Sequence, residues 1–167
     1  MNNKVPSNIE KINRSQFTTY LDTTPNANTM DFALLGIGIT NYGISYNPQV
    51  EQEKWIIEDN ARTDHTSNQK QSSVSQKMYK NDPCFEFAHA GLDKLNYKTH
   101  ILDIDNWNGT GNTYPAKLSD GILVATQYMN ENAVIEYDLH YDGDPVEGTV
   151  TFDETTGKPT FTANTSL

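Results

Sequence analysis

The chain has 167 residues and a formal net charge of -10, with 22 acidic and 12 basic side chains. This length fits one domain with its own hydrophobic core, and residues 101–167 hold eleven of the acids but only two of the bases. Such an acidic segment argues against a nucleic-acid-binding surface there, because affinity for phosphates comes mainly from Lys and Arg. The single cysteine, Cys84, excludes an internal disulfide and a multi-cysteine metal site.

No stretch of the sequence has the composition of a membrane anchor or a leader. The longest apolar run, Phe32–Ile39, has eight residues including two glycines, well short of the roughly 18 that a spanning helix needs. The first 13 residues are polar and precede no apolar segment. We therefore expect synthesis in a cytoplasm-like compartment and no contact with a membrane.

Glycine and turn-forming residues divide the first third of the chain, which predicts short elements there. In chain order we expect a flexible arm over residues 1–13, a short helix over Arg14–Leu21, strands over Phe32–Ile39 and Gly43–Tyr46, and an extended segment over Glu51–Asp59 with Trp55, Ile56 and Ile57 at its centre. Residues 14–167 are expected to form a single domain.

A polar run from Asp59 to Ser73 follows the extended segment. Ala61 is its only aliphatic residue, so burial within the run cannot compensate for the entropy of ordering it. Beyond it, the alternation of Val74, Gln76 and Met78 with polar residues predicts a strand over 72–79. The sequence thus predicts a long hairpin with an unstructured loop. Connections of this length are usually functional or disordered, so we expect that either a partner orders this loop or nothing does.

One helix is predicted after Asp82, which can cap the first free amides, with Pro83 at the first helical position. Apolar residues then recur at helical spacing and form a stripe suited to packing on a sheet. The stripe consists of Phe85, Ala88, Leu92 and Leu95. We expect about three to four turns, with Gly91 as the weak point.

The second half is predicted to be strands and turns. Strands are expected over Lys98–Asn106, Lys117–Met129, Ala133–Tyr141, Val146–Phe152 and Pro159–Ala163, with turns at 107–112, 130–132, 143–145 and 155–158. The alternation in Ala133–Tyr141 puts Tyr137 and Leu139 in the core and leaves Glu136 and Asp138 on the other face. We therefore predict a mainly β fold: a β-sandwich or open barrel of about eight strands, one flanking helix and a long protruding hairpin.

No motif predicts catalysis, a metal or a cofactor. Gly36-Ile-Gly38 lacks the third glycine and the following helix of a dinucleotide-binding loop. The segment Asp103–Gly109 has Trp107 where a calcium loop needs an oxygen ligand. The four histidines are widely separated. Cys84 lies among apolar residues and is expected to be a buried structural thiol.

Five segments, in order, resemble the major tail protein of long-tailed bacteriophages of Gram-positive bacteria. They are Arg14-Ser-Gln-Phe-Thr-Thr-Tyr-Leu, Phe32-Ala-Leu-Leu-Gly-Ile-Gly-Ile, Tyr46-Asn-Pro-Gln-Val-Glu, Asn81-Asp-Pro-Cys-Phe-Glu-Phe and Gly143-Asp-Pro-Val-Glu-Gly-Thr-Val. The resemblance covers about residues 14–163, and its specificity lies in the joint order of the segments.

This resemblance implies a non-enzymatic structural subunit without a cofactor, part of a virion and synthesised in the host bacterial cytoplasm. Family members form hexameric rings that stack into a tail tube, around a tape-measure protein and ending at terminator and distal tail proteins. DNA passes through the tube without specific binding. By the resemblance, the predicted loop would contact the next ring through Asp59, Asn60, Arg62, Asp64, His65, Asn68 and Lys70. Glu136, Asp138 and Lys77 would line the channel.

Two alternatives remain open at the level of sequence. A carbohydrate-binding β-sandwich module of a phage or cell-surface protein would use exposed aromatic rings for stacking, with Trp55, Trp107, Tyr114 and Tyr128 as candidates. A hydrolase would use an acid pair such as Asp103 and Asp105, which lie two residues apart on one predicted strand. A tail-like bacteriocin is a further setting for the same structural role.

Overall fold

The computed structural model describes residues 9–129 and 131–164, and the expected arm over residues 1–13 therefore lies mostly outside the described part. The chain forms β1 (Phe17–Asp22), β2 (Phe32–Leu34), β3 (Pro48–Glu53), β4 (Arg62–Asn68), β5 (Gln71–Lys77), α1 (Pro83–Ala90), β6 (Tyr97–Asp105), β7 (Thr113–Met129), β8 (Val134–Phe152) and β9 (Pro159–Ala163), with 3-10 turns at Arg14–Gln16 and Asn106–Asn108. The predicted mainly β class is confirmed. No helix in the described part has the length and apolar composition to cross a bilayer.

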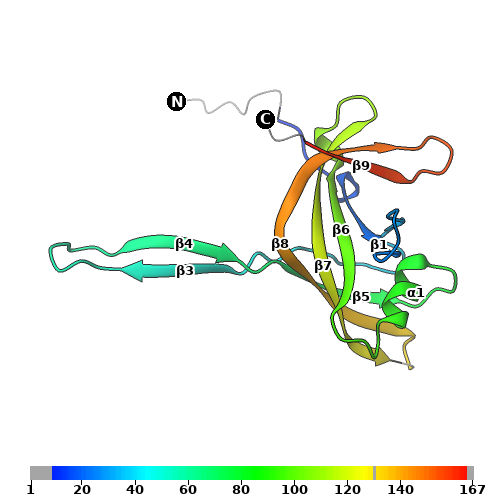
Figure 1. Cartoon of the computed structure of the whole chain (residues 1–167), viewed down its shortest axis with the longest axis horizontal. Coiled ribbons are helices and arrows are strands. Elements are labelled where there is room, and N and C mark those ends of the chain that lie inside the picture. Colours follow the sequence, from blue (N-terminus) through cyan, green and yellow to red (C-terminus); the bar gives the residue numbers. More distant parts are fainter. Residues whose placement is uncertain (1–8, 130, 165–167) are drawn as a thin grey trace.

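The strands form a nearly closed antiparallel barrel and a separate two-stranded arm (Figure 1). The barrel runs in the order β2-β1-β6-β7-β8-β5, and β9 pairs with the far half of β8. Between its edge strands, the segment after β2 forms single bridges to β5, from Ile39 to Gln76 and from Ser45 to Gln71. These bridges replace the longer strands predicted at 32–39 and 43–46, since β2 ends at Leu34 and the chain turns over residues 35–38 before it reaches Ile39.

Hydrophobic side chains pack on both faces of the central strands. One cluster lies inside the barrel beneath α1 and includes Leu21, Ile101 and Tyr137, all fully buried. The other lies on the opposite face beneath β9 and includes Leu102 and Val150. Neighbouring residues of β6 thus enter different clusters, Ile101 the first and Leu102 the second, so both faces of this strand are covered.

The helix has its predicted start but is shorter than predicted. The Asp82 side chain accepts a hydrogen bond from the Cys84 amide, and the last helical residue is Ala90. A Cβ atom on Gly91 would lie 2.4 Å from the Tyr97 ring, so the chain turns at a position where only glycine fits. As a result Leu95 falls beyond the helix and is exposed, contrary to the predicted stripe.

Two further predictions of local structure were wrong. Residues 17–22 form a strand instead of a helix, because Thr18, Thr19 and Tyr20 pair with β6 and β-branched and aromatic residues suit a sheet. Residues 143–145 do not end a strand. They lie in an irregularity of β8, where the register passes from Asp142 to Val146, and Gly143 has a positive φ. The bend lets a single strand serve both clusters.

Candidate functional site

The arm formed by β3 and β4 is the most exposed part of the described chain. Every residue of both strands is exposed, and their register runs from Pro48 opposite Asn68 to Glu53 opposite Arg62. Seven residues of strand at about 3.3 Å each give β4 a length of about 23 Å. The arm projects from the barrel as a ribbon (Figure 1), and neither of its outer edges pairs with another described strand.

This arm corrects the predicted hairpin. The two strands were expected at 51–59 and 72–79, with the polar run as an unstructured loop, yet β4 lies within that run and β5 belongs to the barrel. The ribbon buries neither face, so its sequence has no hydrophobic alternation to reveal it. The turn is at residues 54–61 instead.

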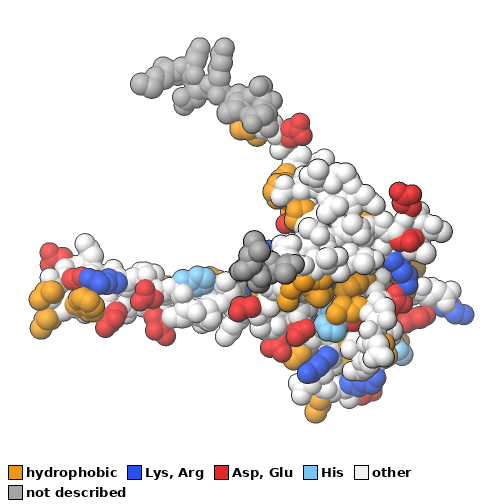
Figure 2. Space-filling model, turned by 45° about the horizontal axis from the view of Figure 1, so that its top comes forward, with side chains coloured by type: hydrophobic (Ala, Val, Ile, Leu, Met, Phe, Trp, Pro, Cys, Tyr) orange, Lys and Arg blue, Asp and Glu red, His pale blue; other side chains and the backbone are white. Residues whose placement is uncertain are grey.

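The tip of the arm is apolar, a feature that the sequence reasoning missed. Trp55, Ile56 and Ile57 were expected at the centre of a strand, but they lie in the turn with exposed fractions of 46%, 102% and 85%. Figure 2 shows hydrophobic side chains gathered at the outer end of the arm. The Arg62 guanidinium stacks over the Trp55 ring at 3.9 Å and pairs with Glu58 at 2.5 Å. The tip is therefore a structured surface.

The seven residues predicted to contact the next ring are spread along the arm. Asp59 and Asn60 lie in the tip turn, Arg62, Asp64, His65 and Asn68 lie on β4, and Lys70 lies at the base. His65 Nε2 is 2.9 Å from Asn68 Oδ1, so these two side chains contact each other along the strand. The structure thus brings six of the seven onto one projecting element.

The base of the arm is anchored to the barrel around Lys70. Its ammonium lies over the rings of Tyr141 and Tyr46, at 4.7 and 5.6 Å from their centroids, and its carbonyl accepts a hydrogen bond from the Tyr141 amide at 3.0 Å. The Asn47 side chain donates to the carbonyl of Gln69 at 3.1 Å. These contacts fix the direction in which the arm leaves the barrel.

The three residues predicted to line a channel share one outer face of the barrel. Asp138 accepts a hydrogen bond from Ser73 at 2.6 Å, and Glu136 accepts one from Ser75 at 3.2 Å. Lys77 lies diagonally from Glu136 across the β5–β8 ladder. The alternation predicted for this strand is confirmed, since Ile135, Tyr137 and Leu139 on its other face are fully buried.

A hollow of about 770 Å³ lies between the ends of β1 and β6 and the segment after β2, and we call it the groove. Asp103 forms part of its floor, accepting hydrogen bonds from Thr19 at 2.6 Å and Tyr141 at 3.0 Å. Burial raises the pKa of this carboxyl, against the opposing effect of these two hydrogen bonds. Asp105 lines the same groove. The sequence predicted that Asp103 and Asp105 lie on one strand, but no pattern in it predicted the groove.

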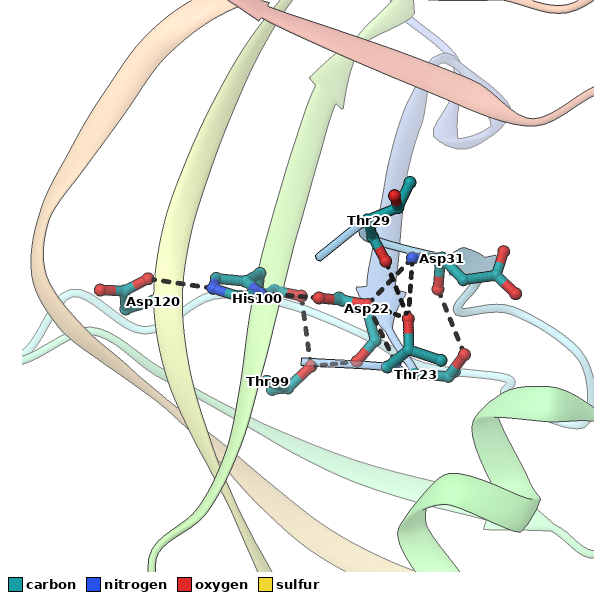
Figure 3. Close-up of polar contacts among 8 residues, drawn as sticks. Asp22, Thr23, Thr29, Asp31, Thr99, His100 and Asp120 are labelled. Atoms are coloured by element: carbon teal, nitrogen blue, oxygen red, sulfur yellow. Dashed lines mark hydrogen bonds and ion pairs between the residues drawn. The ribbon is translucent and has the colours of Figure 1, made fainter. Parts of the chain in front are cut away.

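A second polar cluster joins three strands and a loop (Figure 3). His100 lies between two carboxylates, with Nδ1 2.7 Å from Asp22 Oδ2 and Nε2 3.6 Å from Asp120 Oδ1. The other oxygen of the buried Asp22 accepts hydrogen bonds from the amides of Thr24 and Asp31. The hydroxyls in the cluster already donate to backbone carbonyls or to Asp22. We interpret the cluster as a clamp that holds the loop after β1.

The remaining candidate chemistry is dispersed. Among residues 9–129 and 131–164, no three His, Cys, Asp or Glu side chains lie close enough to hold a metal ion. Cys84 is fully buried as expected, and burial raises its pKa to about 12. The aromatic residues considered for glycan stacking are divided among three elements. Trp55 is at the arm tip and Trp107 is in a 3-10 turn. Tyr114 and Tyr128 lie near opposite ends of β7, where Tyr114 packs on Phe152 and Tyr128 on His89.

The chain matches no protein-family model, and no curated protein is similar to it in sequence.

Proposed function

We propose that this protein is a structural subunit that assembles with copies of itself into a stacked tube, the tail tube of a phage or of a tail-like bacteriocin. The observation that carries the proposal is the arm, whose two strands expose every residue and end in three exposed apolar side chains. That the assembly is a tube, and that each ring has six subunits, is inferred from the sequence resemblance alone.

The physics of the arm favours a partner. An isolated two-stranded hairpin is at best marginally stable in water, and within the described part of the chain β3 and β4 have no third strand or core beneath them. Exposed strand edges also invite pairing with another chain. Contact with a neighbouring subunit would order the arm and remove the apolar tip from water.

The outer face that carries Glu136, Asp138 and Lys77 suits the wall of a channel in this assembly. A basic wall would bind DNA non-specifically, with dissociation constants of about 0.1 mM to 1 µM per site. Repeated around every ring, such contacts would arrest the genome through avidity. Two carboxylates held by serine hydroxyls instead repel phosphates. The charge imbalance of residues 101–167 agrees with this role.

The resemblance extends the proposal to partners and location. In the virion the tube would enclose a tape-measure protein and end at terminator and distal tail proteins, with no enzymatic activity and no cofactor. We expect the DNA to pass without specific binding.

Electron microscopy of the purified protein over a concentration series tests the proposal, together with sedimentation in solution. We expect rings or hollow tubes above a threshold concentration. The matched variant replaces residues 50–66 with Asn-Gly, which joins Gln49 to Ser67 through a two-residue hairpin turn. This variant should fold, because the arm contributes no core residue, and it should form no tubes.

Tubes of normal length from the shortened variant would remove the arm from the mechanism. A wild-type protein that stays monomeric at every concentration, even with particle ends added as initiators, would contradict the proposal. Specific glycan binding by such a monomer would favour a carbohydrate-binding module instead.

A further inference from the structure

We infer that the groove is the receptor for the arm tip of a second copy of this chain. The inference rests on the proposed function, because it names the surface that the arm contacts in the assembly. Each chain carries two exposed apolar surfaces, the turn at Trp55, Ile56 and Ile57 and the groove at the ends of β1 and β6. The turn of one copy would bind in the groove of another.

The groove has the character of a docking surface. Its walls include Phe17, Leu34 and Tyr46, which are 53%, 44% and 55% exposed. Large apolar side chains that cluster at a hollow with this much exposure mark sites of interaction more often than scattered ones do. Its volume of about 770 Å³ lies within the range of about 300–1,000 Å³ that is typical of ligand-binding pockets in proteins.

The occupant must come from another copy. The arm begins at Tyr46 and Asn47, directly beside the groove that Tyr46 lines, and it runs away from the barrel (Figure 1). A paired ribbon about 23 Å long cannot fold back on its own base without breaking its ladder. The tip of one molecule is thus out of reach of its own groove.

Charge supports this pairing. Both surfaces carry both signs of charge: Lys54 precedes the apolar turn and Asp59 follows it closely, whereas Asp105 and Arg14 line the groove. The Asp105 side chain accepts no hydrogen bond and forms no ion pair within the described part of the chain. Opposite charges at the rim of an apolar contact favour one orientation over its reverse.

The two surfaces are different parts of the same molecule, so the contact between copies is heterologous. Heterologous contacts close into rings or continue as open filaments, and they do not stop at a dimer. The pairing of tip and groove therefore produces an extended assembly from one kind of subunit, without a second protein at each contact.

Cross-linking between two variants that each carry one added cysteine tests the pairing. Asn60→Cys places a thiol on the tip turn and leaves its three apolar side chains intact. Gly43→Cys places one on the groove wall, where an added Cβ meets no atom within 4 Å. The native Cys84 does not interfere, because it is fully buried and its pKa is raised to about 12. Ser15→Cys is a second groove variant, should Gly43→Cys fail to fold, because Ser15 is an exposed residue of the groove lining and its replacement leaves the apolar wall intact.

Leu95→Cys is the matched control. Leu95 is 94% exposed and precedes the first residue of β6, whereas Asp105 at the groove is the last residue of that strand. The groove variant and the control variant are each mixed with Asn60→Cys, at a concentration at which the protein assembles. Each mixture is then treated with a short bismaleimide. We expect about tenfold or more linked product from the groove variant, since docking holds the thiols at millimolar effective concentration.

The outcomes separate this inference from the proposed function. Preferential linkage to the groove supports both. Rings or tubes that link equally well to Leu95→Cys, or better, would overturn the groove as receptor while leaving the tube subunit in place. An absence of both assembly and linkage at all concentrations would overturn both.

Discussion

Removing the apolar side chains of the arm tip should abolish assembly and leave the subunit intact. The change is Ile56→Ser together with Ile57→Ser. The two isoleucines are 102% and 85% exposed and belong to neither hydrophobic cluster, so the free energy of unfolding of the monomer should stay within about 0.5 kcal/mol of the wild-type value. Thermal unfolding followed by circular dichroism checks this part.

The effect on assembly follows from the area that docking would bury. Complete burial of one isoleucine side chain contributes about 1.5–3 kcal/mol, so the pair contributes about 3–6 kcal/mol to each contact. This corresponds to a dissociation constant about 10²–10⁴-fold higher. A single contact must also compensate for the entropy of association, about 4–15 kcal/mol. We therefore expect wild-type assembly with a sharp concentration threshold, and none from the double variant.

Sedimentation velocity across a concentration series, with electron microscopy of the same samples, measures the threshold. Val146→Ser is the matched control, because Val146 is 49% exposed and lies outside both the arm and the groove. It should assemble like the wild type. The reasoning is refuted if the tip variant assembles at the wild-type threshold, or if it unfolds at a clearly lower temperature.

Three further predictions concern the channel face, the core and pH. Glu136→Lys with Asp138→Lys should permit tube formation but impair DNA delivery, and unimpaired infection by such particles would argue against a channel position. Gln76→Leu should lower the free energy of unfolding by about 2–5 kcal/mol in urea titrations, because the buried side chains of Asp82 and Tyr137 and the part-buried carbonyl of Ile37 each lose a hydrogen bond; a loss below 1 kcal/mol would contradict this. Burial raises the pKa of Asp103 above its ordinary value of 3.8. The protonated carboxyl therefore contributes stability that is fully present below pH 3.8 and is lost as the pH rises through the pKa of the folded state. Asp103→Asn should flatten that part of the pH dependence in urea titrations and be more stable than the wild type at neutral pH, and an unchanged slope would refute the assignment.

Local chemistry in the sequence determined the elements that carry their own signal. Asp82 and Pro83 specified where the helix begins, because capping and a preset φ act within a few residues. The alternation around Tyr137 specified which face of β8 is buried, since one side must leave water. The mainly β class follows from the number of such segments.

Other features depended on contacts between distant residues. Residues 17–22 became a strand because β6 pairs with residues 17–21 from eighty or more positions away. The residues around Gly143 signal a turn, yet the long β7 partner keeps the chain extended through them. The arm has no alternating pattern, because neither of its faces is buried within the subunit.

The candidate site divides in the same way. The polar composition of residues 59–73 predicted that this part of the chain depends on a partner, because it lacks the apolar side chains that would bury it, and this stays a prediction. The apolar turn and the groove were decided only by the tertiary structure. The groove brings together Phe17, Leu34, Tyr46 and Asp105, which are far apart in the sequence. No local pattern relates these residues, because closing loops over such separations depends on the whole packed barrel.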